Sequence, residues 1–240
     1  MVNNCIIINL DNRTDLWNNL TSFREEWIKL GKICNRISGI SYKNKSNVIN
    51  AFVLDNKINL NGSGFRKSKN AFLGELGCYM SHVESWKYII NNNLDNCLIL
   101  EDGIEFIRND LQNLSIDEND DIIFINEEMI KQNNNFIGYG TQGYILTNTG
   151  AHKLIKHCEI LSMPIDLQIR ELCNQNNINA NIMDYPFVKR KMNRESSIDE
   201  IILKQNDNIN LNDKQDISSI IYRIITNLLK KNINLDDFLE

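Results

Sequence analysis

The sequence predicts an α/β protein with a sheet flanked by helices. The chain opens with a short apolar run, a stretch of helical periodicity and a second apolar run, which is the strand–helix–strand unit of parallel sheets. Further short apolar runs then alternate with helix-like stretches along the chain. The 240 residues are enough for one large domain or two small ones.

The first element is a strand expected over residues 5–10, where an apolar run indicates a central position in the sheet. Polar turn residues 11–14 follow, and a helix is then expected from apolar residues at helical spacing: Leu16, Leu20, Phe23, Trp27 and Leu30. Gly31 is a typical helix stop. Residues 33–40 are expected to form the second strand.

The least periodic part of the first half is residues 41–70. Within it, residues 59–70 form a locally basic loop that contains Arg66, Lys67 and Lys69. The preferred interpretation is a solvated surface loop. The alternative is a lid whose cations approach an anionic ligand.

The remaining elements follow the same periodicities. A strong helix is expected from about Leu73 to Ile90, with Glu75 in its first turn. Later strands are expected at 97–100, 121–126, 144–146 and 178–185. Later helices are expected at 149–161 and 166–174. These elements make a single domain over residues 1–198. Residues 199–240 then form a linker and an amphipathic helix, expected over 217–229.

Composition excludes several classes of function. A net charge of −5 argues against nucleic acid as the main partner, because phosphate binding needs a concentrated positive field. The six cysteines form no Cys-x-x-Cys pair, which favours a reducing, cytoplasmic compartment and no zinc site. No run approaches 18 apolar residues, so no membrane span is expected. The C-terminal helix is expected to pack onto the domain, with a homodimer or membrane-surface contact as alternatives.

The most informative stretch is the apolar run 97–100, which ends in the carboxylates Glu101, Asp102 and Glu105. A buried strand does not hold bare carboxylates, so they are expected where the strand emerges. Ligands of open α/β sheets bind at the carboxyl ends of strands. Acids clustered there suit a divalent cation, a ribose or a proton.

Two further clusters precede that strand. Asn9 and Arg13 follow the first strand, where Arg13 is either a surface arginine beside a helix cap or a bidentate partner of phosphate. Ser81 and His82 lie on the glycine-containing helix. A lone helical histidine is more often a structural residue than a catalyst, but His82 does not follow the apolar stripe cleanly, which adds slight support to a ligand contact.

A fourth cluster is a loop with three glycines in residues 138–143, which includes Gln142. The loop allows close backbone approach to a ligand, but it lacks the spacing of a dinucleotide fingerprint or a P-loop. Asp166 follows a proline at the expected start of a helix. It is either an N-cap or a base at the rim of the sheet.

In their order along the chain, these motifs resemble glycosyltransferase family 25, which includes bacterial lipooligosaccharide galactosyltransferases and collagen galactosyltransferase domains. The resemblance runs from about Asn3 to Ile198. It rests on these segments: Asn9-Leu10-Asp11-x-Arg13, Gly74–His82 with Trp86, Leu98–Asp102, Gly143–Leu146 with Gly150-Ala151-x-Lys153-Leu154, Pro164–Asp166 and Ser196–Ile198.

The resemblance implies a GT-A-type, Rossmann-like mixed sheet and a role in glycan biosynthesis. It implies inverting transfer of a hexose, commonly galactose or glucose, from a UDP-sugar to a hydroxyl of a glycan or protein acceptor. The implied nucleotide-sugar site contains Asn9, Arg13, Ser81, His82, Glu101, Asp102 and Gln142. Asp166 is the implied catalytic base, with Glu75 as its rival.

The chain departs from the family pattern at Gly103, where the third acid of the Glu-Asp-Asp motif is expected. We therefore expect Mn²⁺ or Mg²⁺ binding to be weakened or absent, with Glu101, Asp102 and Glu105 as the candidate ligands. Cations of the basic loop are an alternative source of positive charge. A binding-only pseudoenzyme, or a protein-interaction module that uses the 217–229 helix, is the competing class of function.

Overall fold

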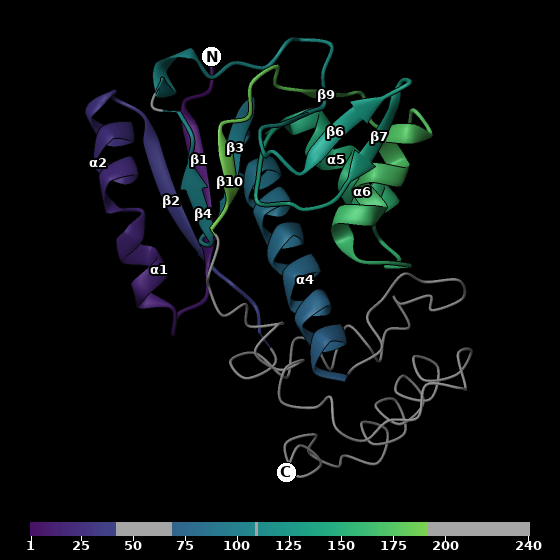
Figure 1. The fold of residues 1–240 in the computed structure, drawn as a ribbon, viewed down its shortest axis with the longest axis horizontal. Helices are drawn as coiled ribbons and strands as arrows, with labels where there is room; N and C mark the ends of the chain where they lie inside the picture. Colours follow the sequence, from purple (N-terminus) through teal and green to yellow (C-terminus); the bar gives the residue numbers. More distant parts are fainter. Residues whose placement is uncertain (42–68, 109, 192–240) are drawn as a thin grey trace. The chain divides into compact units, whose positions relative to one another are not determined.

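The computed structural model describes residues 1–41, 69–108 and 110–191 (Figure 1). The chain forms two compact units. The larger unit comprises Met1–Gly39, Met80–Glu159 and Ile165–Arg194, and the smaller comprises Ile40–Tyr79, Ile160–Pro164 and Glu195–Glu240. The expected 217–229 helix, the 198/199 boundary, the Ser196–Ile198 motif, Arg66 and Lys67 lie outside the described residues.

A six-stranded sheet with the order β2-β1-β3-β8-β5-β9 is the centre of the larger unit. Its strands are β1 (Asn4–Asn9), β2 (Ile33–Ser38), β3 (Asn96–Glu101), β5 (Ile122–Phe124), β8 (Gly143–Thr147) and β9 (Ala180–Ile182). Strand β8 is antiparallel to both of its neighbours, β3 and β5, whereas the other pairs are parallel. The predicted mixed α/β architecture is therefore confirmed.

Helices cover both faces of this sheet (Figure 1). The helices are α1 (Thr14–Asn19), α2 (Thr21–Lys29), α4 (Lys69–Asn91), α5 (Asn148–His157) and α6 (Ile165–Asn174). On one face, Phe23 and Trp27 of α2 join a core cluster with Ile7 and Leu98 of the central strands. On the other face, the part of α4 beyond Met80 contacts Tyr144 through hydrogen bonds.

Two short antiparallel ribbons complete the larger unit. Strand β4 (Ile104–Phe106) pairs with β10 (Val188–Arg190), and β6 (Met129–Gln132) pairs with β7 (Asn135–Gly138). A 3-10 turn, η1, spans Leu111–Asn113. The β6–β7 turn places Asn133 and Asn134 at positive φ, which is the backbone of a tight hairpin turn and suits asparagine.

The first expected helix is in fact two helices that meet at Leu20. Leu20 caps both helices and its side chain is buried in the core cluster. Gly31 ends α2 as predicted, with a φ of 75°. The amide of Gly31 donates to Ile28 O and that of Lys32 donates to Trp27 O, which is the Schellman arrangement.

Helix α4 begins at Lys69, earlier than expected, so Glu75 lies beyond its first turn. Helix α5 ends at His157 rather than near Leu161. Within the described residues, no helix combines the length and the apolar character needed to cross a membrane.

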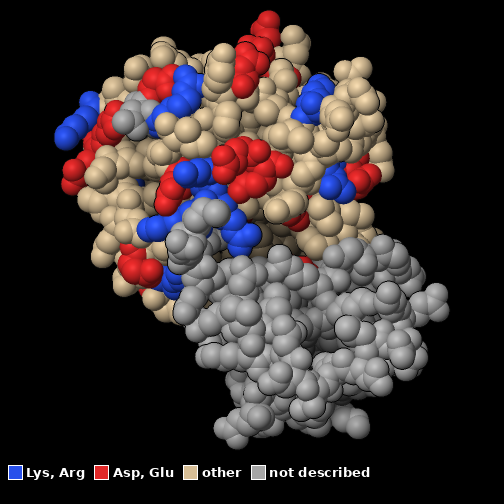
Figure 2. Space-filling view, in the orientation of Figure 1, with Lys and Arg blue, Asp and Glu red and all other residues tan. Residues whose placement is uncertain are grey.

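The cysteines of the described part are free thiols, four of them buried: Cys5, Cys97, Cys158 and Cys173. Burial raises the pKa of the Cys158 and Cys173 thiols to about 12. On the face shown in Figure 2, acidic and basic side chains of the described residues lie next to one another.

Candidate functional site

The carboxyl ends of β1, β3 and β5 share one edge of the sheet because these strands run in the same direction. Strand β8 runs the opposite way, so its first residue, Gly143, lies at that same edge. The edge therefore collects Asn9, Glu101, Asn126 and the glycine loop that leads into β8. This is where α/β sheets bind ligands.

Asn9 is the hydrogen-bonding centre of one half of this edge, and it is 1% exposed. Its Nδ2 donates to Asp102 Oδ2 at 2.8 Å and to Arg13 O at 3.0 Å. Its Oδ1 accepts from Arg36 Nε at 2.9 Å and from Arg36 Nη2 at 2.7 Å. Arg36 also pairs with Asp11 at 3.0 Å. Asn9 thus fixes a carboxylate and a guanidinium on either side of itself.

Arg36 was not predicted as a site residue, whereas Arg13 was. The Arg13 side chain pairs with Asp15, with 3.4 Å between Nε and Oδ1. Arg36 comes from β2, the strand hydrogen-bonded to β1, and its register partner Ile7 lies two residues before Asn9. Only the strand pairing reveals this proximity, so the sequence carried no direct signal for it.

The second half of the edge is a buried chain of hydrogen bonds that ends on Glu101. Trp86 Nε1 donates to the Tyr144 hydroxyl at 2.9 Å, and that hydroxyl lies 2.8 Å from His82 Nδ1. Because the Glu101 carboxylate only accepts, His82 Nε2 is the donor toward it, and Nδ1 of a neutral imidazole then accepts from the Tyr144 hydroxyl. His82 Nε2 lies 3.4 Å from Glu101 Oε1, and Thr141 Oγ1 donates to the same oxygen at 2.7 Å.

The glycine loop is held from both sides. Asn126 Nδ2 donates to Gly140 O at 3.0 Å and to Gln142 Oε1 at 2.9 Å. Gly140 N donates to Asp166 Oδ2 at 3.0 Å. The backbone oxygen of Gln142 accepts from Glu101 N at 3.0 Å. The structure therefore connects predicted residues Glu101, Gln142 and Asp166 through this loop.

The other predicted residues occupy different surroundings. Ser81 is buried on α4, and its carbonyl accepts from Ser85 Oγ. Glu75 is buried on the part of α4 that belongs to the smaller unit. Glu105 lies on β4, directly opposite Lys189 of β10, and the two side chains are 3.5 Å apart.

The third position of the acidic motif is structural in this chain. Gly103 is buried, and its carbonyl accepts from Lys191 N at 3.0 Å. The acids at the strand end are thus Glu101 and Asp102. Two carboxylates are a donor set that fits Mg²⁺ or Mn²⁺ when the ion also keeps water ligands and contacts substrate phosphates.

Asn126, Thr141 and Tyr144 also belong to the site, although sequence reasoning did not select them. A signal existed for Asn126, because Ile125-Asn126 follows β5 just as Ile8-Asn9 closes β1. Thr141 and Tyr144 flank Gln142 and gave no comparable signal.

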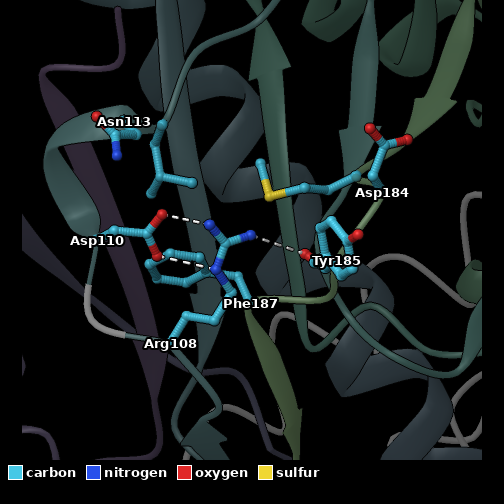
Figure 3. Close-up of a pocket in the computed structure, with 8 residues that line it drawn as sticks. Arg108, Asp110, Asn113, Asp184, Tyr185 and Phe187 are labelled. Carbon is cyan, nitrogen blue, oxygen red and sulfur yellow. Dashed lines mark hydrogen bonds and ion pairs between the residues drawn. The ribbon is translucent and has the colours of Figure 1, made fainter.

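A cavity of about 200 Å³ lies elsewhere, between the β3–β5 connection and the segment before β10 (Figure 3). Leu114, Met183 and Phe187 contribute its apolar lining. Arg108 Nε donates to Asp110 Oδ1 at 2.9 Å, and Nη1 donates to Tyr185 O at 3.4 Å. The hydrogen bonds from Arg108 lower the pKa of Asp110. Arg108 is thus engaged with Asp110 and the Tyr185 carbonyl, and the lining contains none of the predicted site residues.

Comparison with known proteins agrees with the residues at the sheet edge. The sequence model of "Glycosyltransferase family 25 (LPS biosynthesis protein)" matches residues 2–137. Procollagen galactosyltransferase 1 of Danio rerio is 26% identical over 135 residues, which covers 47% of this chain and 22% of that protein. Procollagen galactosyltransferase 1-B of Xenopus laevis is 31% identical over 103 residues, which covers 34% of this chain and 17% of that protein.

A bacterial relative is the "Putative glycosyltransferase" of Haemophilus influenzae, which is 27% identical over 116 residues, covering 41% of this chain and 40% of that protein. This chain therefore matches less than half the length of each of these relatives. The family match includes Asn9, Glu101, Asp102 and Asn126, and it ends just before the glycine loop and Asp166. Since it extends over more than half of the 240 residues, the chain belongs to glycosyltransferase family 25.

Proposed function

We propose that this chain transfers a hexose, galactose or glucose, from a UDP-sugar to a hydroxyl of a glycan or protein acceptor, with inversion at the anomeric carbon. The observation that carries the proposal is the edge of the sheet, where Asn9 holds Asp102 and the glycine loop connects Glu101 to Asp166. In this proposal the larger unit is a GT-A-type domain. The names of the relatives, procollagen galactosyltransferases, support galactose as the first sugar to test.

The donor half of the proposed site must stabilise a leaving nucleoside diphosphate, on which negative charge grows as the sugar departs. Glu101 and Asp102 would hold a Mn²⁺ or Mg²⁺ ion, which when bound neutralises charge on the diphosphate. Asn9 fixes the orientation of Asp102, and Thr141 and His82 fix that of Glu101. With no carboxylate at Gly103, we expect weaker dependence on metal than in a three-acid site.

The acceptor half needs one base opposite the leaving group. We assign this role to Asp166. The acceptor oxygen forms a bond to the anomeric carbon while the bond from that carbon to the diphosphate oxygen breaks. The hydroxyl proton passes to the Asp166 carboxylate, and UDP leaves with the bonding electrons. Attack from the opposite face inverts the configuration.

The proposal is tested by UDP release from a panel of UDP-sugars, with and without Mn²⁺, using wild type and Asp166→Asn. We expect Asp166→Asn to lower turnover by roughly 10²–10⁴-fold, because general-base assistance has that magnitude. Binding of the UDP-sugar, measured by calorimetry, should change little. Asp184→Asn is the matched control, since Asp184 is exposed and lies at the separate cavity. Full turnover in Asp166→Asn would remove Asp166 as the base.

The second candidate is a binding-only protein of the same family, and Gly103 is the observation that favours it. This candidate predicts calorimetric binding of a UDP-sugar with no UDP release for any acceptor. The third class, an interaction module that uses the helix expected from the sequence over 217–229, predicts self-association or partner binding that deletion of residues 215–240 abolishes.

A further inference from the structure

We propose that Asn126 is a positioning residue of the transfer reaction, which acts on Asp166 through Gly140. The inference rests on the function proposed above, because it gives Asp166 the role of the base. It adds a residue that touches neither the reacting atoms nor the donor, and whose effect on the chemistry is transmitted through two hydrogen bonds.

Asn126 is built into the sheet edge rather than exposed to a ligand. It follows β5, its side chain is 1% exposed, and its backbone bridges to Val188. Its Nδ2 donates to Gly140 O and to Gln142 Oε1. A backbone carbonyl such as Gly140 O only accepts, so the amide nitrogen of Asn126 faces the loop, and exchanging nitrogen and oxygen would place Asn126 Oδ1 against Gly140 O.

The opposite end of this amide is unsatisfied. Among the residues that the structure describes, none donates to Asn126 Oδ1, although that oxygen is buried. A buried acceptor without a donor is unfavourable, and such groups are rare in folded proteins. The two bonds to the loop are therefore the hydrogen bonds that hold the Asn126 side-chain amide in place.

Gly140 transmits the contact to Asp166. Its carbonyl accepts from Asn126, and its own amide donates to Asp166 Oδ2 at 3.0 Å. Gly140 has a φ of 102°, and a Cβ there would lie 2.1 Å from Gln142 Oε1. The other oxygen of Asp166 accepts from Leu167 N at 2.9 Å. One of the two contacts that orient the Asp166 carboxylate thus depends on the residue that Asn126 holds.

The loop is also attached to α6, the helix that carries Asp166, because Arg170 Nη1 donates to Gly138 O at 2.8 Å. Arg170 therefore ties the loop to α6, while Asn126 ties it to β5. We infer that Asn126 sets the position of Asp166 relative to the sheet edge where Glu101 and Asp102 lie. A displacement of about 1 Å at a reacting group is enough to cost on the order of 10²-fold in rate.

The test is Asn126→Asp, which keeps the size of the side chain but replaces the two N–H donors by an oxygen facing two acceptors. We expect kcat for UDP release to fall roughly 10- to 100-fold, with KM for the UDP-sugar changed less than about threefold. Asn148→Asp is the matched control. Like Asn126, Asn148 donates from Nδ2 to two acceptors, but these are the backbone carbonyls of Ile89 and Leu94, both at 3.3 Å, and they lie at the opposite edge of the sheet. Asn148→Asp should lower the melting temperature and leave kcat unchanged.

Asn126→Ser is the second variant, in case Asn126→Asp does not fold, since serine is too short to reach both acceptors and adds no charge. It should show the same fall in kcat. A folded Asn126→Ser enzyme with kcat within twofold of wild type would overturn the proposal.

The double variant Asn126→Asp with Asp166→Asn separates this inference from the proposed function. If Asn126 acts through Asp166, the double variant should be no slower than Asp166→Asn alone. If the two fold-losses in kcat multiply in the double variant, Asn126 acts independently of Asp166. The inference would then fail while the proposed function stood. Full activity of Asp166→Asn, or no UDP release by the wild type, would overturn the proposed function and this inference with it.

Discussion

Replacing Tyr144 by phenylalanine should destabilise the protein strongly, although it removes a single oxygen atom. That oxygen accepts from Trp86 Nε1 at 2.9 Å and lies 2.8 Å from His82 Nδ1. The exposures of Tyr144, Trp86 and His82 are 0%, 0% and 1%, so water cannot replace the lost contacts. The variant leaves the indole N–H and one imidazole nitrogen without this partner.

The magnitude follows from these two stranded groups. Each buried polar group that loses its partner costs about 1–3 kcal/mol, which gives roughly 2–6 kcal/mol for Tyr144→Phe. For a chain of this size the melting temperature falls by about 2–4 °C per kcal/mol. Urea unfolding, monitored by circular dichroism, measures the loss in unfolding free energy directly. An unchanged slope of that free energy against urea concentration would show that the unfolded state is unaltered.

The matched control is Tyr185→Phe, because Tyr185 is 72% exposed. Its unfolding free energy should change by less than about 0.5 kcal/mol. A loss below about 1 kcal/mol in Tyr144→Phe would refute the assignment of a buried Trp86–Tyr144–His82 chain, since stranding even one buried group costs about that much.

Two further predictions concern the fold. Gly31→Ala should lower the unfolding free energy by about 1 kcal/mol in urea titration, because Gly31 has a φ of 75° while nothing lies within 4 Å of an added Cβ; an unchanged midpoint would contradict this. Burial raises the pKa of the Glu128 carboxyl. The folded state therefore binds the Glu128 proton more tightly than the unfolded state does, so the unfolding free energy is highest below the unfolded pKa and falls as pH rises through the folded pKa. Glu128→Gln, which carries no charge, should be more stable than wild type at pH 7, and its stability should depend less on pH. Stability curves of equal slope between pH 4 and 8 would show that Glu128 does not titrate in this way.

The sequence predicted the central elements well because their burial is two-sided. The run ending at Leu100 is apolar on both faces, so strand β3 (Asn96–Glu101) was located to within a residue. The continuous apolar pattern from Leu16 to Leu30 concealed the break at Leu20. When two consecutive helices turn their apolar sides the same way, a break between them leaves the spacing of apolar residues almost unchanged.

The short ribbons were missed for a different reason. Strands β4 and β10 have three residues each, and β6 and β7 have four, which is too short for periodicity to distinguish them from loops. The β6–β7 turn did have a signal in Asn133-Asn134, because asparagine tolerates the positive φ that a tight hairpin turn requires.

The site was predictable at strand ends and not between them. The acids after β3 and the Asn9 cluster lie next to recognisable apolar runs. Arg36 and Asn126 act through partners 27 and 14 residues away, respectively, and those contacts depend on strand order. Nothing in the local pattern shows that β8 lies antiparallel between β3 and β5.

That strand order also governs how the protein can assemble. The strand that joins the two halves of the sheet, β8, is synthesised after both of its neighbours. Until residue 147 has left the ribosome, β3 and β5 each present an unpaired edge, and such edges invite pairing with other chains. A nascent chain stopped before Gly143 would therefore expose the β2-β1-β3 fragment and the lone strand β5, whose other neighbour, β9, is synthesised later still. Aggregation during synthesis is expected to depend on how quickly β8 follows the glycine loop into its place between β3 and β5.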